Sequence, residues 1–367
     1  MERCSHCGAE VRPGEACRVA GEIICPTCAD THTRICARCG ERIWEEENCG
    51  DEDTVLCSGC YEDHYTRCSR CGRVIAYSSA HYAEDDEDEE TPYCPNCYSE
   101  CGEAIHCYSY KPTPVFYGKG PLYMGVELEV DDGGRDAGNA RKILSVFNQG
   151  AEYGYIKSDG SLDDGLELVT HPCTLAEHQT AVPWEEVLEK IRDLGYRSHQ
   201  SRTCGLHVHV NRTAFGQTLS QQDERIGHVL YLFERFWQEL LRFSRRTQRQ
   251  VEQWAARYGY KDTGREILEN AKKSCKGRYT CINLTNANTI EFRIFRGTLK
   301  YNTLIATLQF VEKLCSVAFS LSEEELQALS WSDLMLGIQE QQYPELVRYL
   351  KERRLYVNEP VTAESEV

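Results

Sequence analysis

Three short pairs of polar residues have the types and the spacing to bind metal ions and phosphate together. Each pair has one apolar residue between its members: Glu127-Leu-Glu129, His207-Val-His209 and Glu291-Phe-Arg293. Because side chains alternate between the two faces of a strand, both members of a pair face the same way while flanking hydrophobes face a core. Carboxylates with an imidazole suit Mg²⁺ or Mn²⁺, and an arginine beside them suits a phosphate. The pairs therefore predict chemistry on ATP.

The common nucleotide-binding and nucleophile motifs do not occur in the sequence. It has no Gly-x-Gly-x-x-Gly, no Gly-x-x-x-x-Gly-Lys-Ser/Thr and no Gly-x-Ser-x-Gly. Neither Rossmann, P-loop nor hydrolase-elbow chemistry is supported. Any use of ATP must come from the three pairs themselves.

The elements that must position these pairs begin near residue 122. Alternating runs predict strands at 122–130, 152–158, 165–170, 205–211, 279–284 and 289–296. Helical spacing predicts helices at about 174–194, 222–257, 302–320 and 343–354. Because strands and helices do not alternate strictly, we predict an α+β fold with a mainly antiparallel sheet and packed helices.

Two further segments complete an ordered set of five motifs. They are Lys157-Ser-Asp-Gly-Ser-Leu162 and Gly165-Leu-Glu-Leu-Val-Thr-His-Pro172, which contains Glu167. With the three pairs, this order over residues 122–320 resembles the amidoligase family. That family is similar to glutamine synthetase and glutamate–cysteine ligase in its carboxylate–amine ligase fold. The resemblance implies a glutamine-synthetase-like sheet and an ATP-dependent, amide-bond-forming ligase, and the family also places zinc-ribbon-like modules ahead of such domains.

The resemblance also implies two sites for divalent ions, Mg²⁺ or Mn²⁺, in a funnel lined by the sheet. Glu129 and Glu167 would hold one ion. Glu127, His207 and Glu291 would hold the other. Two ions would neutralise phosphate oxygens while a carboxylate attacks the γ-phosphorus, giving an acyl phosphate that an amine converts to an amide.

Other polar residues have roles around the nucleotide in this resemblance. His209 would lie near the phosphates, and Arg293 would touch the transferring γ-phosphoryl group. Asp159 would orient the amine or bind substrate. Further candidates for phosphate or a substrate carboxylate are Arg296, Arg278 and Lys157. Asn283 matches a recurrent family position without a clear role.

A run of arginines at helical spacing lies on the helix predicted at 222–257. Its members are Arg242, Arg245, Arg246 and Arg249. We interpret them as one solvated stripe rather than a substrate-binding surface. The sequence does not decide whether residues 242–249 contact substrate.

Cysteines define a separate N-terminal region. Of 21 cysteines, 16 precede residue 110, and twelve of these form Cys-x-x-Cys pairs. The first pairs repeat every 32 residues and each is followed by glycine. Such pairs predict three structural Cys₄ zinc sites, because units this small need a metal to fold. The predicted ligands are Cys4, Cys7, Cys25 and Cys28; Cys36, Cys39, Cys57 and Cys60; and Cys68, Cys71, Cys94 and Cys97.

Other potential ligands recur in register within the repeat. They are Cys17, Cys49 and His81 in one set, and His32, His64 and Cys101 in the other. Some could replace a pair member or bridge neighbouring units, although the spacing favours pairing within each unit. Closed Cys₄ sites are not catalytic, so the array is either a platform for a protein partner or substrate, or a stabilising cap.

The boundaries follow from these patterns. We predict zinc modules at 1–32, 33–64 and 65–110, a linker at 111–121 after Cys107, a catalytic domain at 122–320 and a helical extension at 321–367. The acidic run Glu84–Glu90 in the third module is interpreted as a solvated loop.

Charge and hydropathy exclude some classes of protein. Residues 1–110 hold 9 Lys and Arg against 23 Asp and Glu, giving −14 of the total −17. This acidity argues against a nucleic-acid partner. We find neither a signal peptide nor an apolar stretch of about 18–20 residues, so we expect no membrane and a cytoplasmic location.

The sequence analysis therefore predicts an ATP- and Mg²⁺-dependent ligase with three structural zinc ions, acting on an amino acid, a peptide or a protein. One alternative is a hydrolase in which His207, His209 and a glutamate hold a catalytic zinc. Another is a non-enzymatic adaptor that works through the zinc array. The sequence leaves the acid, the amine and the oligomeric state open.

Overall fold

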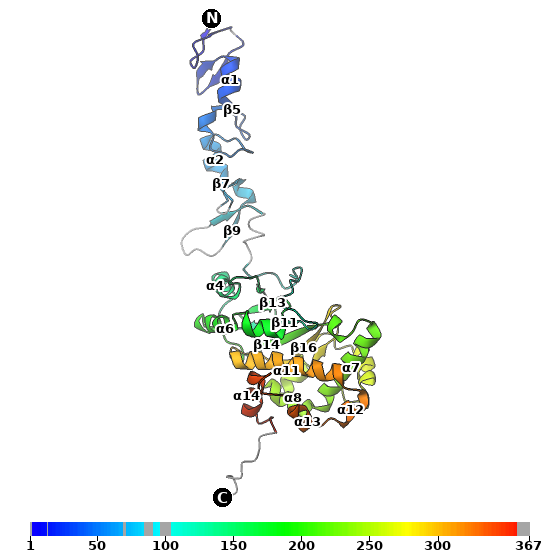
Figure 1. Cartoon of the computed structure of the whole chain (residues 1–367). Helices are drawn as coiled ribbons and strands as arrows, with labels where there is room; N and C mark the ends of the chain where they lie inside the picture. The colour runs from blue at the N-terminus through cyan, green and yellow to red at the C-terminus, as the bar shows by residue number, and fades with distance from the viewer. Residues whose placement is uncertain (1, 13, 69–70, 84–90, 96–103, 358–367) are drawn as a thin grey trace. The chain divides into compact units, whose positions relative to one another are not determined.

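The computed structural model describes residues 2–12, 14–68, 71–83, 91–95 and 104–357. The chain divides into two compact units, Met1–Glu103 and Ala104–Val367 (Figure 1). The predicted linker 111–121 lies within the second unit. The boundaries between the three zinc modules, and that at residue 320, remain predictions.

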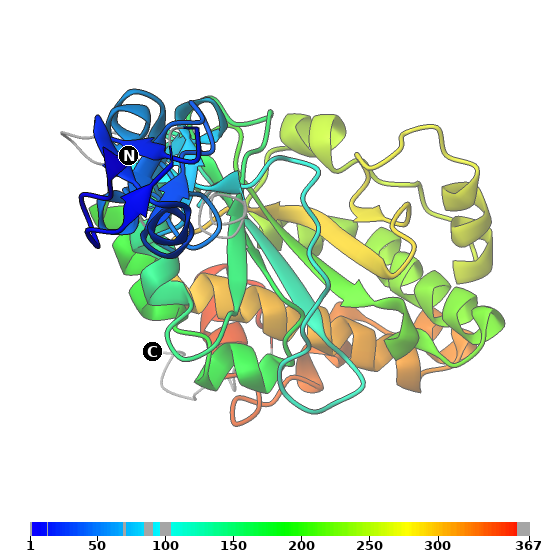
Figure 2. The same cartoon turned by 90° about the horizontal axis from the view of Figure 1, so that it is seen from above.

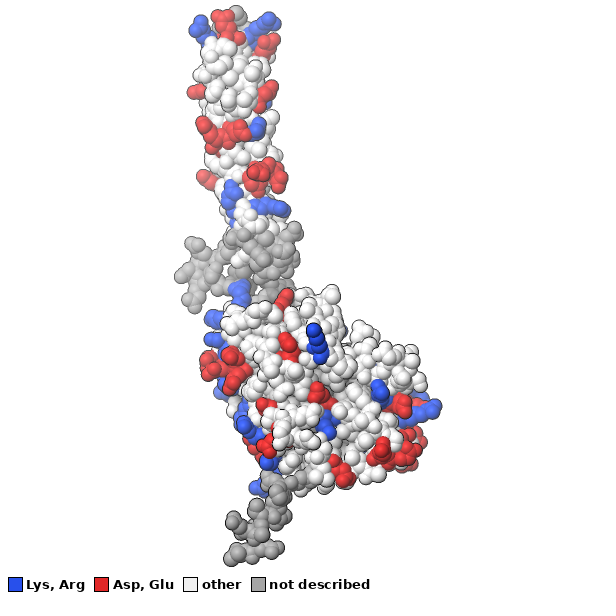
Figure 3. Space-filling view, in the orientation of Figure 1, with Lys and Arg blue, Asp and Glu red and all other residues white. Residues whose placement is uncertain are grey.

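The first unit repeats one small arrangement. Its elements are β1 (Glu2–Arg3), β2 (Glu10–Val11), β3 (Cys17–Val19), β4 (Glu22–Ile24), α1 (Pro26–His32), β5 (Thr33–Ile35), β6 (Arg42–Trp44), η1 (Glu45–Glu47), α2 (Ser58–His64), β7 (Tyr65–Arg67), β8 (Val74–Ala76), η2 (Tyr77–Ser79), β9 (His81–Ala83) and β10 (Thr91–Tyr93). Two-stranded antiparallel ribbons alternate with short helices, and few buried apolar residues lie between them. The acidic run Glu84–Glu90 lies outside the described residues. On the face drawn in Figure 3, the red side chains of other Asp and Glu residues recur along the modules.

The second unit contains a six-stranded sheet with the order β12-β13-β11-β14-β16-β15. Its strands are β11 (Met124–Val130), β12 (Gly154–Lys157), β13 (Leu166–Thr170), β14 (Gly205–Asn211), β15 (Ile282–Asn283) and β16 (Thr289–Arg296). All pairs of neighbours are antiparallel. The α+β class and the antiparallel sheet are therefore confirmed, whereas likeness to glutamine synthetase remains a prediction.

Helices cover the apolar face of this sheet. In Figure 1, α11 lies directly below β14 and β16, with further helices beyond it. The helices are α4 (Ala137–Phe147), α5 (Leu175–Thr180), α6 (Trp184–Asp193), α7 (Leu219–Arg235), α8 (Trp237–Ser244), α9 (Gln248–Trp254), α10 (Gly264–Lys272), α11 (Tyr301–Ser320), α12 (Glu323–Ala328), α13 (Trp331–Leu336) and α14 (Pro344–Glu352), with the 3₁₀ turn η3 (Arg212–Phe215). Val126, Leu128, Val208 and Phe292 point into this core and are completely buried. The opposite face, which carries the polar pairs, is left for a site.

Two predicted helices are interrupted. The helix expected at 174–194 is two helices separated by Pro183, which cannot donate a backbone hydrogen bond within a helix. The helix expected at 222–257 is three helices. Phe236 is the cap that follows α7, and Arg245, which has a left-handed φ of 63°, is the cap that follows α8. Helices α4 and α10 were not predicted.

One helix of the described residues, α11, is long and apolar enough to span a membrane by length and composition. The sequence analysis had found no such stretch, because polar residues interrupt the apolar ones. In the structure 72% of its most apolar 18-residue stretch is buried, as expected for a core helix.

Candidate active site

Strand pairing places Glu129 and Glu167, the two ligands predicted for one ion, in one row across the sheet. Glu129 on β11 lies opposite Glu167 on β13, and Glu167 lies opposite Lys157 on β12. All three side chains are nearly inaccessible to solvent. The Lys157 Nζ is 3.0 Å from Glu167 Oε2, so the ammonium neutralises a carboxylate that burial would otherwise make costly.

The remaining predicted ligands occupy the next two rows. Glu127 lies opposite His207, while His209 lies opposite Glu291 on β16. The His207 Nδ1 is 3.3 Å from Glu127 Oε2 and 3.8 Å from Glu291 Oε1. Side chains that are 80 or more residues apart in sequence thus converge because their strands are neighbours.

A bulge in the β14–β16 pairing aims the arginine of the third pair. The register shifts between Leu206 and Val208, so that two residues of β16 face the single residue His207. Bulges of this kind bend a strand and redirect a side chain, and they recur beside active sites. Here Arg293 contacts Glu291 Oε1 and lines the same cavity as the carboxylates. The sequence predicted which residues share a face but not this bulge.

Two groups of these side chains are close enough to hold a metal ion. They are Glu127, His207 and Glu291, and Glu129, Glu167 and His207, with ligand atoms within 4.8 Å of one another in each group. Oxygen ligands about 2.0–2.1 Å from Mg²⁺ fit this spacing. His207 belongs to both groups, with Nδ1 toward Glu127 and Nε2 4.0 Å from Glu129 Oε1. Because a neutral imidazole has one free lone pair, His207 can ligate only one of two ions.

Gly205 allows the second group to come together. Its backbone N–H donates to Glu129 Oε2. A Cβ at this position would lie 2.6 Å from both Arg246 Nη2 and His207 Nε2, and 3.2 Å from Glu129 Oε2. These three polar groups therefore pack against the space that only glycine leaves empty.

Acidic and basic side chains in the site favour each other's charged forms. Burial opposes ionisation of Glu127, but the His209 charge and the hydrogen bond with His207 hold the pKa of Glu127 well below its usual value. Against burial, Glu127 raises the pKa of His209 to about 9. Burial and repulsion from Glu127 raise the pKa of Glu167 to about 8, and Lys157 opposes that shift. The raised pKa of Glu167 thus reflects burial and the carboxylates packed around it, which make its ionisation costly.

Amide groups orient Glu291. Asn283 Nδ2 donates to Glu291 Oε2 over 2.7 Å, and Asn286 Nδ2 donates to the same oxygen over 3.3 Å. This leaves Oε1 facing the histidines and Arg293. Asn283, whose role was unclear from sequence, therefore fixes the carboxylate that it pairs with.

The interpretation of the arginine run as one solvated stripe is wrong. Arg245 ends α8 in the left-handed conformation, so residues on either side of it do not share a helix face. Arg246 is buried, donates to the Phe295 carbonyl and lines the cavity, whereas Arg242 and Arg249 are exposed. Burial lowers the pKa of Arg246 to about 10 while Glu129 opposes this, so the guanidinium stays charged at neutral pH.

The cavity above the sheet has a volume of about 870 Å³. A strap formed by residues 104–116 runs over it, and Figure 2 shows this segment crossing in front of the strands. The strap is held by His106, whose N–H donates to Ile156 and whose carbonyl accepts from Ser158, on either side of Lys157. Lys157, Asp159 and Arg278 all line the cavity, whereas Arg296 does not appear in its lining.

Arg278 reaches the strap. Its guanidinium contacts the Tyr108 hydroxyl and lies 5.5 Å from the centre of that ring. The ammonium of Lys157 is 5.7 Å from the same ring centre. Tyr108 thus contacts two of the cations that were predicted to bind phosphate or substrate. The boundaries predicted from sequence divide the strap between the third zinc module (to residue 110) and the linker (from residue 111), whereas residues 104–116 all belong to the second unit.

Asp131 is a buried residue that sequence reasoning missed. It follows β11 and accepts from the backbone N–H groups of Asp163 and Asp164 and from the Thr203 hydroxyl. These bonds tie the turn after β12, which carries Asp159, to the end of β11. The position directly after Glu-Leu-Glu-Val was the available signal.

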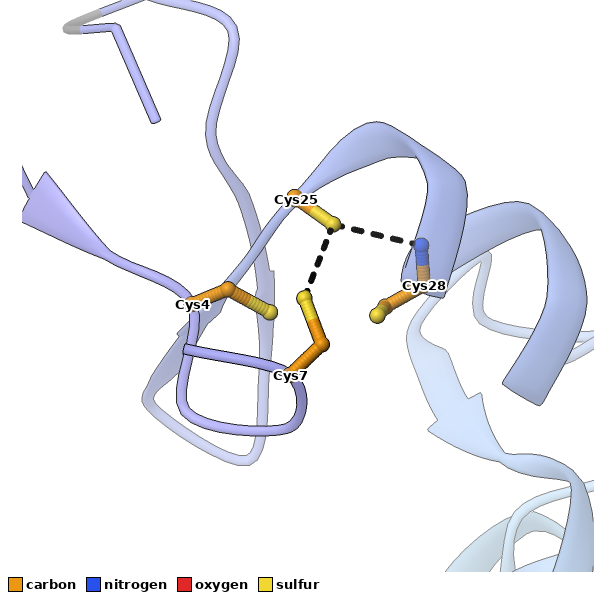
Figure 4. Close-up of side chains that lie close together, drawn as sticks. All are labelled: Cys4, Cys7, Cys25 and Cys28. Atoms are coloured by element: carbon orange, nitrogen blue, oxygen red, sulfur yellow. Dashed lines mark hydrogen bonds between the residues drawn. The ribbon is translucent and has the colours of Figure 1, made fainter. Parts of the chain in front are cut away.

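The zinc-module unit brings its predicted ligands together within each repeat. Figure 4 shows Cys4, Cys7, Cys25 and Cys28 pointing toward one centre, and a second cluster has the corresponding four cysteines of the next repeat. The Sγ atoms of Cys7 and Cys25 are 3.7 Å apart. Zn–S bonds of about 2.3 Å in a tetrahedron give about 3.8 Å, so the cluster could hold zinc.

The third cluster contains Cys68, Cys71 and Cys94; its predicted fourth member, Cys97, lies outside the described residues, as does Cys101. In each first pair a glycine with positive φ closes the turn, for example Gly8 at 75°, whose N–H donates to Cys4. Hydrogen bonds from the backbone of Cys7 and Cys25 lower the pKa of Cys4 to about 6, which favours a thiolate ligand.

Several residues that were kept as alternative zinc ligands lie outside these clusters. In the described part of the chain, none of the metal-sized groups includes Cys17, Cys49, His32, His64 or His81. His32 instead packs against His6, with ring centres 4.4 Å apart and the rings tilted by 39°. Cys107 is exposed, and its thiol forms a hydrogen bond with the Ser109 hydroxyl in the strap.

The second unit is thus an α+β domain whose antiparallel sheet presents carboxylates, histidines and arginines to one cavity. Residues 145–315 match the family model described as "Putative amidoligase enzyme". The match confirms the resemblance carried by the motifs, and it supports an amide-bond-forming ligase. Glu127 and Glu129 precede the matched range. Comparison with curated proteins gives no match for the chain.

Proposed function

We propose that the chain is an ATP- and Mg²⁺-dependent carboxylate–amine ligase that forms an amide or peptide bond through an acyl phosphate. The observation that supports this best is that the two candidate metal-binding clusters and Arg293 line one cavity. Two divalent ions held by these groups would neutralise phosphate oxygens and polarise the γ-phosphorus.

The chain's own residues have distinct tasks in the proposed reaction. Arg293 stabilises the charge that develops as a substrate carboxylate oxygen bonds to the γ-phosphorus and ADP leaves. The amine nitrogen then bonds to the acyl carbon, phosphate leaves, and the amine gives up a proton. Asp159 lines the cavity and is half-buried, so we assign it to binding the incoming ammonium group.

His209 belongs to neither candidate metal group among the described residues, which supports a phosphate-binding role rather than ligation of a catalytic zinc. Arg293 likewise has no role in a zinc hydrolase. We propose an amino acid, a peptide or a protein as substrate, Mg²⁺ or Mn²⁺ as the ion, and the cytoplasm as the location. The zinc array is proposed to bind a protein partner or substrate.

The test is nucleotide consumption by the zinc-loaded protein with Mg²⁺ and mixtures of amino acids or peptides. We expect ADP and phosphate to be released in proportion to a new amide, which mass spectrometry detects. No binding of ATP with Mg²⁺ would contradict the proposal. Activity with zinc and no nucleotide would favour a hydrolase.

A further inference from the structure

Each carboxylate of the metal-free site has a basic neighbour. Glu127 Oε1 is 3.2 Å from His209 Nε2, Glu167 Oε2 is 3.0 Å from Lys157 Nζ, and Glu291 contacts Arg293. Glu129 and Arg246 both border the space beside Gly205. Four carboxyl groups thus lie beside four basic groups, so their formal charges balance when all eight are ionised.

This balance opposes binding of divalent ions alone. Two such ions would add four positive charges to a buried site that is already neutral, and like charges about 4 Å apart repel by about 4 kcal/mol at an effective dielectric constant of about 20. A nucleoside triphosphate brings a comparable negative charge. Without metal ions, the basic side chains are needed to neutralise the carboxylates. Once metal ions are bound, these side chains are free to neutralise an anion instead.

Lys157 is best suited to make that exchange. It lies directly opposite Glu167, a member of the candidate metal group with Glu129 and His207. An ion about 2.0–2.1 Å from the Glu167 carboxylate would take the space and the charge that the ammonium now supplies. The contact of Lys157 with Glu167 is also close but poorly directed, because Glu167 Oε2 has no hydrogen bond of good geometry. A lysine has a flexible stem and a compact charge, so its ammonium can turn into the cavity.

We propose that Lys157 serves as a counter-ion in the metal-free protein and is released by a divalent ion to bind a phosphate of the nucleotide. The backbone around it is held by the strap residue His106 on both sides, so the exchange involves the side chain alone. The Tyr108 ring, 5.7 Å from Nζ, gives the displaced ammonium an aromatic neighbour in the cavity. The phosphate step rests on the proposed function, whereas the exchange at Glu167 does not.

The simpler interpretation is a fixed ion pair that only neutralises buried Glu167. Removal of the Lys157 charge strengthens Mn²⁺ binding under both interpretations, because a positive charge beside the ion is lost. The two interpretations differ in the affinity for nucleotide at saturating Mn²⁺. A lysine that stays paired with Glu167 touches no phosphate, so its removal would leave that affinity unchanged, whereas removal of a released, phosphate-binding lysine would weaken it.

The experiment uses full-length, zinc-loaded protein and the variant Lys157→Met, which keeps the length of the side chain without its charge. Binding of Mn²⁺ without nucleotide is followed by electron paramagnetic resonance. We expect at least about tenfold tighter binding, because a repelling charge is removed. At saturating Mn²⁺, binding of a non-hydrolysable ATP analogue should weaken by about tenfold, because a phosphate contact is lost. Lys142→Met, at an exposed position on α4, should change neither affinity.

Unchanged or weaker Mn²⁺ binding by folded Lys157→Met, or an unchanged affinity for the ATP analogue at saturating Mn²⁺, would overturn the proposal. If that variant does not fold, wild-type protein decides: Mn²⁺ and the ATP analogue should strengthen each other's binding by the same factor, as linkage requires. Independent binding would overturn the exchange. Tighter Mn²⁺ binding by Lys157→Met, with no nucleotide bound by either protein, would refute the proposed function and the phosphate step but retain the counter-ion.

Discussion

Replacing Gly205 by alanine tests whether the crowded second metal group is the working part of the site. The new Cβ would lie 2.6 Å from both Arg246 Nη2 and His207 Nε2. Non-bonded heavy atoms prefer about 3.5 Å or more, so the two side chains must each move by about 1 Å. Overpacking of this kind costs about 1–3 kcal/mol of stability. A displacement of about 1 Å at reacting groups lowers turnover by about 100-fold.

The assay measures Mn²⁺ affinity and ATP consumption of Gly205→Ala, with circular dichroism and thermal unfolding to show that the fold persists. Gly160→Ala is the matched control, because a Cβ there meets no atom within 4 Å and its φ is not positive. We expect the control to behave as wild type. Wild-type Mn²⁺ binding and turnover by Gly205→Ala would refute the inference that Arg246, His207 and Glu129 must pack this closely.

Three further predictions concern the metals, the phosphate and the buried acid. Elemental analysis should give about three zinc ions per chain, and about two for Cys28→Ser; one or none in the wild type would contradict the Cys₄ assignment. Arg293→Ala should lower ATP turnover by about 10²–10³-fold while circular dichroism stays unchanged, and full activity would show that our site assignment is wrong. Because the pKa of Glu167 is raised to about 8, the folded protein holds this proton after the unfolded chain has lost it. Stability of Mg²⁺-free wild type should therefore fall between about pH 4.5 and 8, and Glu167→Gln should lack this slope in thermal unfolding. A parallel pH profile for the two proteins would contradict a raised pKa.

Much of the site could be predicted because residues two positions apart in a strand lie on the same face of the sheet. Glu127 and Glu129, two residues apart on one strand, must share a face, and the same holds for His207 and His209. The structure brings these residues together with Glu167 and Glu291, as the motifs predicted. The roles of the individual residues stay predictions.

The parts that could not be predicted depend on backbone irregularities and on tertiary approach. The left-handed residue Arg245 separates Arg246 from its exposed neighbours, and periodicity alone cannot locate such a break. The bulge beside His207 is likewise invisible in an alternating pattern. The strap has no periodicity, so its sequence is divided between a zinc module and a linker, yet it contacts β12 through backbone hydrogen bonds.

Isotope transfer tests the central claim most directly. The zinc-loaded protein is incubated with ATP, Mg²⁺ and a mixture of amino acids and peptides whose carboxyl groups contain ¹⁸O. If an acyl phosphate forms, one carboxylate oxygen must leave with phosphorus, so we predict ¹⁸O in the released phosphate together with a new amide. Phosphate that takes its oxygen only from water, or no consumption of ATP with any mixture, would contradict the ligase assignment.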